Sequence, residues 1–204
     1  MLSSLFGAGR ASAGVPIFPL NTVLFPGGML PLKIFEVRYI DMARECLRAG
    51  TPFGVCLIRE GAEVGAPAVP FPVGCLARIV DCDVEELGVL KVRVEGTERF
   101  RLVASEVNKQ GLIVGETEPL MKEPAVTETQ GLAECADFLR KVIPAIGPER
   151  FGVPLRYDDA SWVGFRLAEI LPLRNDVRQK LLEVTDAALR LGVLHRFLRE
   201  QKLV

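Results

Sequence analysis

The sequence predicts an α+β protein in which a β-rich N-terminal domain precedes a helical C-terminal domain. Short apolar runs separated by Gly and Pro fill residues 15–118, as expected for several short strands. Amphipathic segments with helical spacing fill residues 132–204. Residues 119–131 are polar, contain proline and are predicted to be a linker. With 204 residues, 49% of them hydrophobic, the chain is long enough to bury a core of this kind.

Residues 1–14, MLSSLFGAGRASAG, are predicted to form a flexible N-terminal tail. A secretory signal would place positive charge before a continuous apolar run. This stretch begins without charge and is rich in Gly and Ser, so we do not expect it to be a signal peptide.

The apolar stretch that follows, residues 17–40, reads IFPLNTVLFPGGMLPLKIFEVRYI and is repeatedly interrupted by Pro and Gly. A membrane-spanning helix must satisfy its backbone hydrogen bonds internally, and these residues would leave several unmade. We therefore expect no membrane span, and we interpret the stretch as short strands joined by a turn at FPGG. Exposed apolar side chains mark interaction surfaces, so Leu24, Phe25 and Met29 are candidate protein-binding residues.

The next segment, residues 36–49, is predicted to be a helix that ends at Gly50. Apolar residues recur there at helical spacing and form one stripe, which consists of Val37, Ile40, Ala43 and Leu47. We expect this stripe to pack against the strands.

Three further segments, residues 53–58, 75–84 and 112–117, are predicted strands. A loop with three prolines, residues 61–74, separates the first two. Several short strands at this spacing indicate a small antiparallel or mixed barrel.

The clearest alternation of apolar and charged residues lies in residues 90–102, LKVRVEGTERFRL. We interpret this segment as a β-hairpin that turns at Gly96 and Thr97. Phe100 should then face the core, and a solvated face should carry Arg93, Arg99 and Arg101. A β-face with arginines could alternatively bind an anionic ligand, although nearby glutamates dilute its charge.

Four helices are predicted after the linker. The first two span residues 132–146 and 160–171. For the third and fourth, the candidate N-caps are Asn175 or Asp176, and Thr185 or Asp186.

No residue pattern indicates catalysis, a cofactor or a metal site. No Lys is followed by Ser or Thr, so the phosphate loop of nucleotide hydrolases is not found, and no Ser lies in a nucleophile motif. The one histidine, His195, is expected to be a partly exposed surface group in a helix, and without clustered Cys it makes no zinc site. The five cysteines lack CxxC spacing and are expected to be reduced core residues, which favours a cytoplasmic location.

The charge of the chain argues against nucleic acid as a partner. The sequence holds 25 basic and 26 acidic residues, for a net charge of −1. A surface that follows phosphates needs an excess of Lys and Arg on one face. RNA binding is therefore the weaker alternative.

Several motifs in this order resemble the LON domain, the N-terminal substrate-binding domain of ATP-dependent Lon proteases. They are IFPLNTVLFPGGMLPLKIFEVRY, FGVCLI, VGCLARIVDC and VEGTERFRL, and they cover residues 15–118. The segment LAEILPLRNDVRQKLLEV resembles the helices that follow in the same family. Related domains also occur as stand-alone bacterial proteins and in cereblon-type substrate receptors. The family commonly reads IFEPRY where this chain has Val37, and a proline there is permitted but not required.

The resemblance implies a PUA-like β pseudo-barrel of about six strands, with one early helix, followed by a bundle of about four helices. It implies a non-enzymatic module that binds unfolded or flexible polypeptide, without the ATPase and Ser-Lys protease parts of Lon. Glu36, Arg38 and Tyr39 match the family and are expected to form a polar network that fixes the helix against the barrel.

The resemblance also leaves other partners and functions open. A protease or chaperone acting in trans and a homo-oligomer are both compatible with it. A PUA-like fold equally suits a small-molecule or RNA-binding protein, because fold alone does not determine function.

Overall fold

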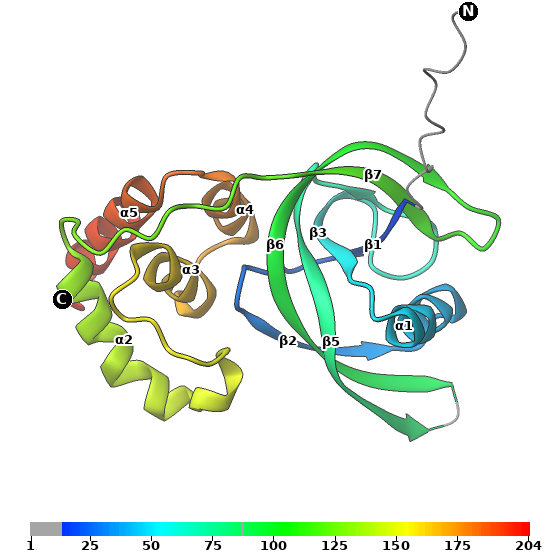
Figure 1. Ribbon diagram of the computed structural model, residues 1–204, viewed down its shortest axis with the longest axis horizontal. Helices are drawn as coiled ribbons and strands as arrows, with labels where there is room; N and C mark the ends of the chain where they lie inside the picture. Colours follow the sequence, from blue (N-terminus) through cyan, green and yellow to red (C-terminus); the bar gives the residue numbers. More distant parts are fainter. Residues whose placement is uncertain (1–13, 87) are drawn as a thin grey trace, which may run out of the picture.

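The computed structural model describes residues 14–86 and 88–204, so the predicted tail lies outside the described residues except for Gly14. The strands are β1 (Val15–Leu20), β2 (Met29–Ile34), β3 (Phe53–Glu60), β4 (Val69–Pro70), β5 (Val73–Glu86), β6 (Val89–Val107) and β7 (Ile113–Pro119). The helices are α1 (Val37–Ala49), α2 (Leu132–Ile146), α3 (Ala160–Ile170), α4 (Asn175–Glu183) and α5 (Ala187–Glu200), with a 3₁₀ turn η1 (Pro148–Arg150). The predicted α+β class is confirmed, and Figure 1 shows the sheet on one side and α2 to α5 on the other.

The seven described strands form one curved sheet. Hydrogen-bonded pairing runs from β1 through β7, β6, β5 and β3, and β3 pairs in parallel with β1 again. β2 pairs with β6, and β4 pairs with β3. The pairing of β1, β7, β6, β5 and β3 thus closes on itself, but β2 and β4 lie outside this circuit and the sheet is not a clear barrel.

The predicted hairpin turn at Gly96 and Thr97 is wrong. β6 runs through both residues, and its turn to β5 lies before Val89. A register shift opposite Cys75 and Ala77 marks a β-bulge, which bends the strand at this point. Gly96 is needed because a Cβ there would lie 2.2 Å from the carbonyl oxygen of Phe25.

Helix α1 buries a stripe shifted from the predicted one. Val37 and Leu47 are exposed, whereas Ile40 and Ala43 are buried as expected. The buried face is completed by Arg38, Tyr39, Met42 and Cys46. The helical spacing of apolar residues therefore predicted the helix correctly, but the face that it buries is rotated from the predicted stripe.

The turn at FPGG joins the sheet to the helical part. Its backbone forms two hydrogen bonds with the β6 bulge. Gly27 N donates to Gly96 O at 2.7 Å, and Gly96 N donates to Gly28 O at 2.8 Å. From the other side, Arg166 of α3 donates to the carbonyl oxygens of Gly27 and of Pro26, the latter at 2.8 Å. The turn is therefore enclosed between two parts of the molecule.

This enclosure removes Leu24 and Phe25 from the candidate protein-binding surface. Phe25 has no exposed surface and packs with its ring centroid 5.7 Å from that of Phe165, within a core shared by sheet and helices. Leu24 is buried in the core between the sheet and α1. Met29, at the start of β2, is half-buried.

The segment predicted as a linker crosses from β7 over the helical part to α2 (Figure 1). Residues 120–129 have no regular secondary structure, yet one side chain in them is deeply buried. Glu123 pairs with Arg99 of β6 and Arg190 of α5, and accepts a hydrogen bond from Ser161 Oγ of α3 at 2.6 Å. The segment therefore fastens the sheet to the helices.

Arg99 was expected on a solvated face, and that expectation is wrong. Its side chain is 4% exposed and donates to the carbonyl oxygens of Leu182 and Val184, where α4 ends. Phe100 is buried, as predicted. The buried guanidinium removes Arg99 from any surface for anionic ligands.

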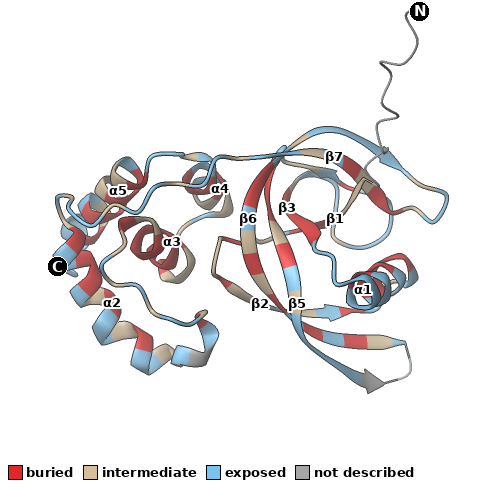
Figure 2. Ribbon diagram, in the orientation of Figure 1, coloured by how far each residue is buried: buried red, intermediate tan, exposed pale blue. Residues whose placement is uncertain are grey.

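The helical part follows the predicted boundaries with two corrections. Asp186 caps α5 as predicted, but α4 begins after Arg174 and has no side-chain cap. His195 is buried, not partly exposed, because its Nε2 lies 2.8 Å from Glu134 Oε2 and Gly131 leaves room for its ring. Figure 2 shows the buried faces of these helices turned towards one another.

The cysteines are unpaired in the described chain, and four of them are buried as expected: Cys46, Cys56, Cys75 and Cys135. Cys82 is exposed. Among residues 14–86 and 88–204, no helix has the length and apolar character needed to cross a membrane.

Candidate functional site

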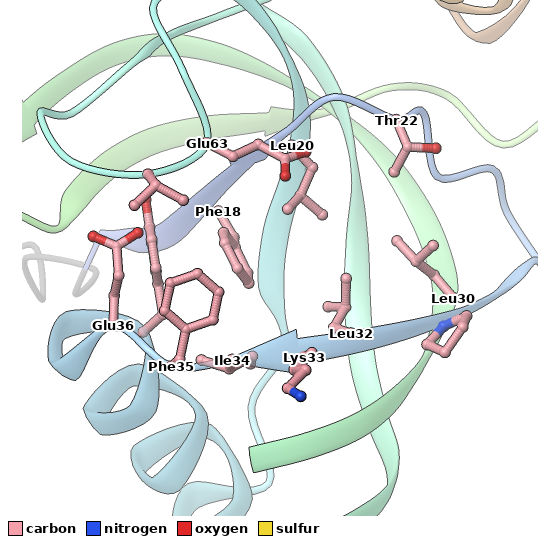
Figure 3. A pocket seen from close by; sticks show the side chains of 13 residues that line it. Phe18, Leu20, Thr22, Leu30, Leu32, Lys33, Ile34, Phe35, Glu36 and Glu63 are labelled. Carbon is pink, nitrogen blue, oxygen red and sulfur yellow. The ribbon is translucent and has the colours of Figure 1, made fainter. Parts of the chain in front are cut away.

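An apolar groove opens between β1 and β2, and we call it the β1–β2 groove (Figure 3). It exists because β1 pairs with β3 and β7 while β2 pairs with β6, so that no hydrogen bonds close the sheet between β1 and β2 in the described chain. Its volume is about 260 Å³. The apolar lining comes from Phe18, Leu20, Leu30, Leu32, Ile34, Phe35, Tyr39 and Val64.

Two large apolar side chains at this groove are exposed to solvent. Phe35, between β2 and α1, is 52% exposed, and Val64, in the loop between β3 and β4, is 57% exposed. The deeper residues Phe18 and Ile34 are buried and give the groove a firm base. Exposed apolar surface beside a preformed hollow is typical of a binding site for apolar groups.

The lining of the groove contains two carboxylates and one ammonium group. Glu36 and Glu63 carry carboxylates, and Lys33 carries the one cationic group of the lining. Glu63 accepts a hydrogen bond from the backbone N–H of Asn21. Glu36 Oε2 accepts from Arg38 Nη2 at 2.8 Å. Both carboxylates are thus held in place. Because Arg38 neutralises Glu36, the other charged groups of the lining are Glu63 and Lys33, which have opposite signs, so the groove suits an apolar ligand without a strong charge preference.

Arg38 positions the loop that forms one side of the groove. Besides Glu36, its guanidinium donates to Gly111 O at 2.9 Å and to Gly65 O at 2.8 Å. Gly65 follows Val64 directly, so this hydrogen bond ties the loop to the start of α1. Arg38 is thus the centre of a polar network of three hydrogen bonds.

Tyr39 contributes an aromatic surface to the same cluster. Its ring stacks on Phe18 at a centroid distance of 4.1 Å, and the Arg38 guanidinium lies 4.7 Å from its ring centroid. Burial raises the pKa of the Tyr39 hydroxyl, and the positive charge of Arg38 only partly opposes this. Tyr39 therefore packs as a neutral side chain.

We expect Arg38→Ala to loosen the loop at residues 61–66, because the carbonyls of Gly65 and Gly111 lose a buried cationic donor. A lost hydrogen bond to a charged group costs about 1.5–3 kcal/mol. Hydrogen exchange should become faster at residues 61–66. Arg44→Ala is the matched control, since Arg44 lies on the same helix with an exposed, long ion pair. Unchanged exchange in Arg38→Ala would contradict this role.

The sequence did not identify the exposed residues of the groove. The residues chosen from sequence as protein-binding, Leu24 and Phe25, are buried, and Met29 does not line the groove. Phe35 could have been found, because in the alternation of MLPLKIF it shares a strand face with Lys33, which is expected to face solvent. Val64 lies in a loop without any periodic signal.

The described residues contain no group of three or more His, Cys, Asp or Glu that could hold a metal ion. Burial raises the pKa of Cys56 to about 12 and that of Cys135 to about 12, which disfavours their thiolate forms. Neither thiol lines the groove.

Comparison with known proteins identifies relatives over nearly the whole chain. The family model described as the ATP-dependent protease La (LON) substrate-binding domain matches residues 14–200. A Lon N-terminal domain protein from Xanthomonas campestris has a similar structure, with a TM-score of 0.74 and 39% identity over 89% of this chain and 96% of that chain.

Other relatives are more distant. The N-terminal domain of the Mycobacterium avium complex Lon protease shares the fold, with a TM-score of 0.66 and 21% identity over 89% of this chain and 95% of that one. Lon protease of Roseiflexus castenholzii is 26% identical over 200 residues, which cover 92% of this chain and 24% of the relative. The chain thus spans about a quarter of the length of the curated Lon protease that it matches.

Proposed function

This chain belongs to the family of the ATP-dependent protease La (LON) substrate-binding domain, and we propose that it binds flexible polypeptide segments in the β1–β2 groove. The observation that carries the proposal is the pair of exposed apolar side chains, Phe35 and Val64, beside a preformed apolar hollow. Such surface is costly to leave in water, and a bound apolar side chain would cover it.

The groove favours weak and adaptable capture. A volume of about 260 Å³ admits one or two apolar side chains at a time. Burying such a side chain contributes about 1.5–3 kcal/mol, and ordering a flexible ligand offsets part of this gain. Affinity in the high-micromolar to millimolar range follows from these values, which suits a module that samples many unfolded sequences.

The edge of β2 offers a second kind of contact. Among the described strands β2 pairs with β6 alone, so its other edge faces the groove. An extended peptide can add to such an edge through backbone hydrogen bonds, which are independent of sequence. Pro31 lacks an N–H, so the added strand would be short.

We further propose that this chain contributes recognition and not hydrolysis. The family match concerns a substrate-binding domain, and the sequence holds no phosphate loop or Ser-Lys motif. Unfolding or cleavage of a bound polypeptide would then require a protease or chaperone component beyond the residues of this chain.

A peptide titration tests the proposed groove. We expect a fluorescently labelled peptide, Lys-Leu-Phe-Leu-Lys, to bind the protein, and Phe35→Ser and Val64→Ser each to weaken binding about fivefold, or about 1 kcal/mol. Leu189→Ser is the control, because Leu189 is 59% exposed but lies on α5, outside the groove lining. Equal binding by all four proteins would exclude the groove, and absence of binding to the wild type would count against the function.

A further inference from the structure

A second and larger hollow lies where the sheet meets the helical part, and we call it the junction cleft. Its volume is about 650 Å³, within the range of common ligand sites. Most of its lining comes from three stretches of chain: residues 95–99 of β6, residues 119–123 from the end of β7 onwards, and residues between 152 and 165. Pro26, Gly27 and Arg78 complete the lining. It is distinct from the β1–β2 groove, with which it shares no lining residue.

The two most exposed large hydrophobic side chains of the described residues both lie at this cleft. Met121 is 87% exposed and Val153 is 85% exposed, and they come from different segments. Trp162 and Phe165, both buried, form the apolar base beneath them. A methionine at the edge of an aromatic base is an adaptable contact for varied apolar side chains.

The charged groups of the lining are mostly engaged with one another. Arg78 pairs with Glu95 at 2.5 Å, and Asp159 caps α3 through the N–H of Ser161. Arg99 and Glu123 are buried in their own ion pairs. These contacts fix the walls of the cleft and leave little charge in them for a ligand.

Three charged side chains of the lining have no ion-pair partner within the described residues: Lys122, Arg156 and Glu98. All three are exposed. Lys122 adjoins Met121 in the chain, and Arg156 lies three residues after Val153. The available charge beside the exposed apolar residues is therefore positive, with one glutamate on the β6 wall.

We propose that the junction cleft is a second polypeptide site, which takes an apolar segment flanked by carboxylates. The apolar side chains of the ligand pack on Met121, Val153 and Trp162. Its carboxylates pair with Lys122 and Arg156. This preference for carboxylates distinguishes the junction cleft from the β1–β2 groove, whose charged groups balance one another, so the two sites favour different segments of an unfolded chain.

Two sites on one module have a functional consequence. An unfolded polypeptide that engages both sites gains avidity, because its second contact is intramolecular. The proposal extends the proposed function but does not depend on the groove, since the two linings are separate.

Two labelled peptides that differ only in their flanking charges test the proposal: Asp-Leu-Phe-Leu-Asp and Lys-Leu-Phe-Leu-Lys. We expect Arg156→Glu to weaken binding of the aspartate peptide about tenfold and Met121→Ser about fivefold, by fluorescence anisotropy. Both residues are exposed, so unfolding midpoints should stay within about 1 °C of the wild type. Binding of the aspartate peptide should also weaken as salt rises.

The controls separate this proposal from the previous one. Phe35→Ser should weaken binding of the aspartate peptide far less than Arg156→Glu does, and Glu98→Gln should bind this peptide no more weakly than the wild type. The proposal is overturned if the aspartate peptide does not bind, or if it binds Arg156→Glu and Met121→Ser as tightly as the wild type. The proposal for the β1–β2 groove is overturned by a different result, in which Phe35→Ser binds the lysine peptide as tightly as the wild type does.

Discussion

Replacing Glu123 with glutamine should lower the free energy of unfolding by about 3–5 kcal/mol, as is typical when one partner of a buried ion pair is lost. The Glu123 carboxylate lies between two guanidiniums whose side chains are 4% exposed or less, those of Arg99 and Arg190. Glutamine has nearly the same shape but no negative charge. Two cations would then remain buried side by side without an anion.

The surroundings of the two arginines explain why the loss should be large and not total. Arg99 also donates to two carbonyls at the end of α4, and Arg190 donates to one of them, Val184 O, at 2.9 Å. The Arg190 guanidinium lies 3.8 Å from the ring centroid of Phe165. These contacts disperse part of the positive charge, but they supply no counterion.

The ion pairs of Glu123 with Arg99 and Arg190 also predict how the free energy of unfolding changes with pH. Hydrogen bonds from Arg190 and Ser161, and the charges of both arginines, outweigh burial and hold the pKa of Glu123 below its ordinary 4.5. A carboxyl with a lowered pKa stabilises the folded state above its unfolded pKa and loses that contribution as pH falls through the folded one. The stability difference between wild type and Glu123→Gln should therefore be full at pH 7 and shrink below pH 4.5.

Chemical denaturation at pH 7 and at lower pH measures both effects. Glu128→Gln is the matched control, because Glu128 is an exposed glutamate of the same irregular segment. A loss below about 1 kcal/mol, the value of an exposed ion pair, would mean that Glu123 is not the link between sheet and helices.

Local sequence signals predicted most helices and strands of this fold. They failed where contacts between residues far apart in the sequence determine whether a residue is buried or lies in a turn. The apolar periodicity of residues 132–146 and 160–171 predicted two helices with nearly correct ends, since spacing alone determines which face is apolar. Gly96 was interpreted as a turn residue, because a local pattern does not distinguish a turn from a close approach. The approaching atom is Phe25 O, 71 positions earlier in the chain.

The candidate site was predicted less well than the fold. The family resemblance drew attention to Arg38, but its contacts with Gly65 and Gly111 join segments far apart in the sequence and have no local signal. Burial of Phe25 depends on α3, which lies about 140 residues further along, so no window of sequence could reveal it. Glu123 looked like an ordinary polar residue of a linker for the same reason.

Phe25→Ala should destabilise the protein by about 3–5 kcal/mol, the range for a fully buried phenylalanine. The side chain has no exposed surface and packs on Phe165 in the core shared by sheet and helices. Alanine would leave a cavity at the first position of the FPGG turn, whose backbone Arg166 and the β6 bulge hold from two sides. Because that backbone is fastened independently, the cavity should collapse only in part.

Phe35→Ala provides the opposite case within the same segment. Phe35 is half exposed, so its loss should change the free energy of unfolding by less than about 1 kcal/mol. The same substitution should weaken binding of the lysine peptide. Phe25→Ala, measured below its unfolding transition, should bind that peptide like the wild type. If Phe25→Ala had the stability of the wild type but no longer bound the peptide, Phe25 would be a binding residue and not a core residue. The two phenylalanines therefore separate, in one pair of variants, the residues that hold the fold from those that meet the ligand.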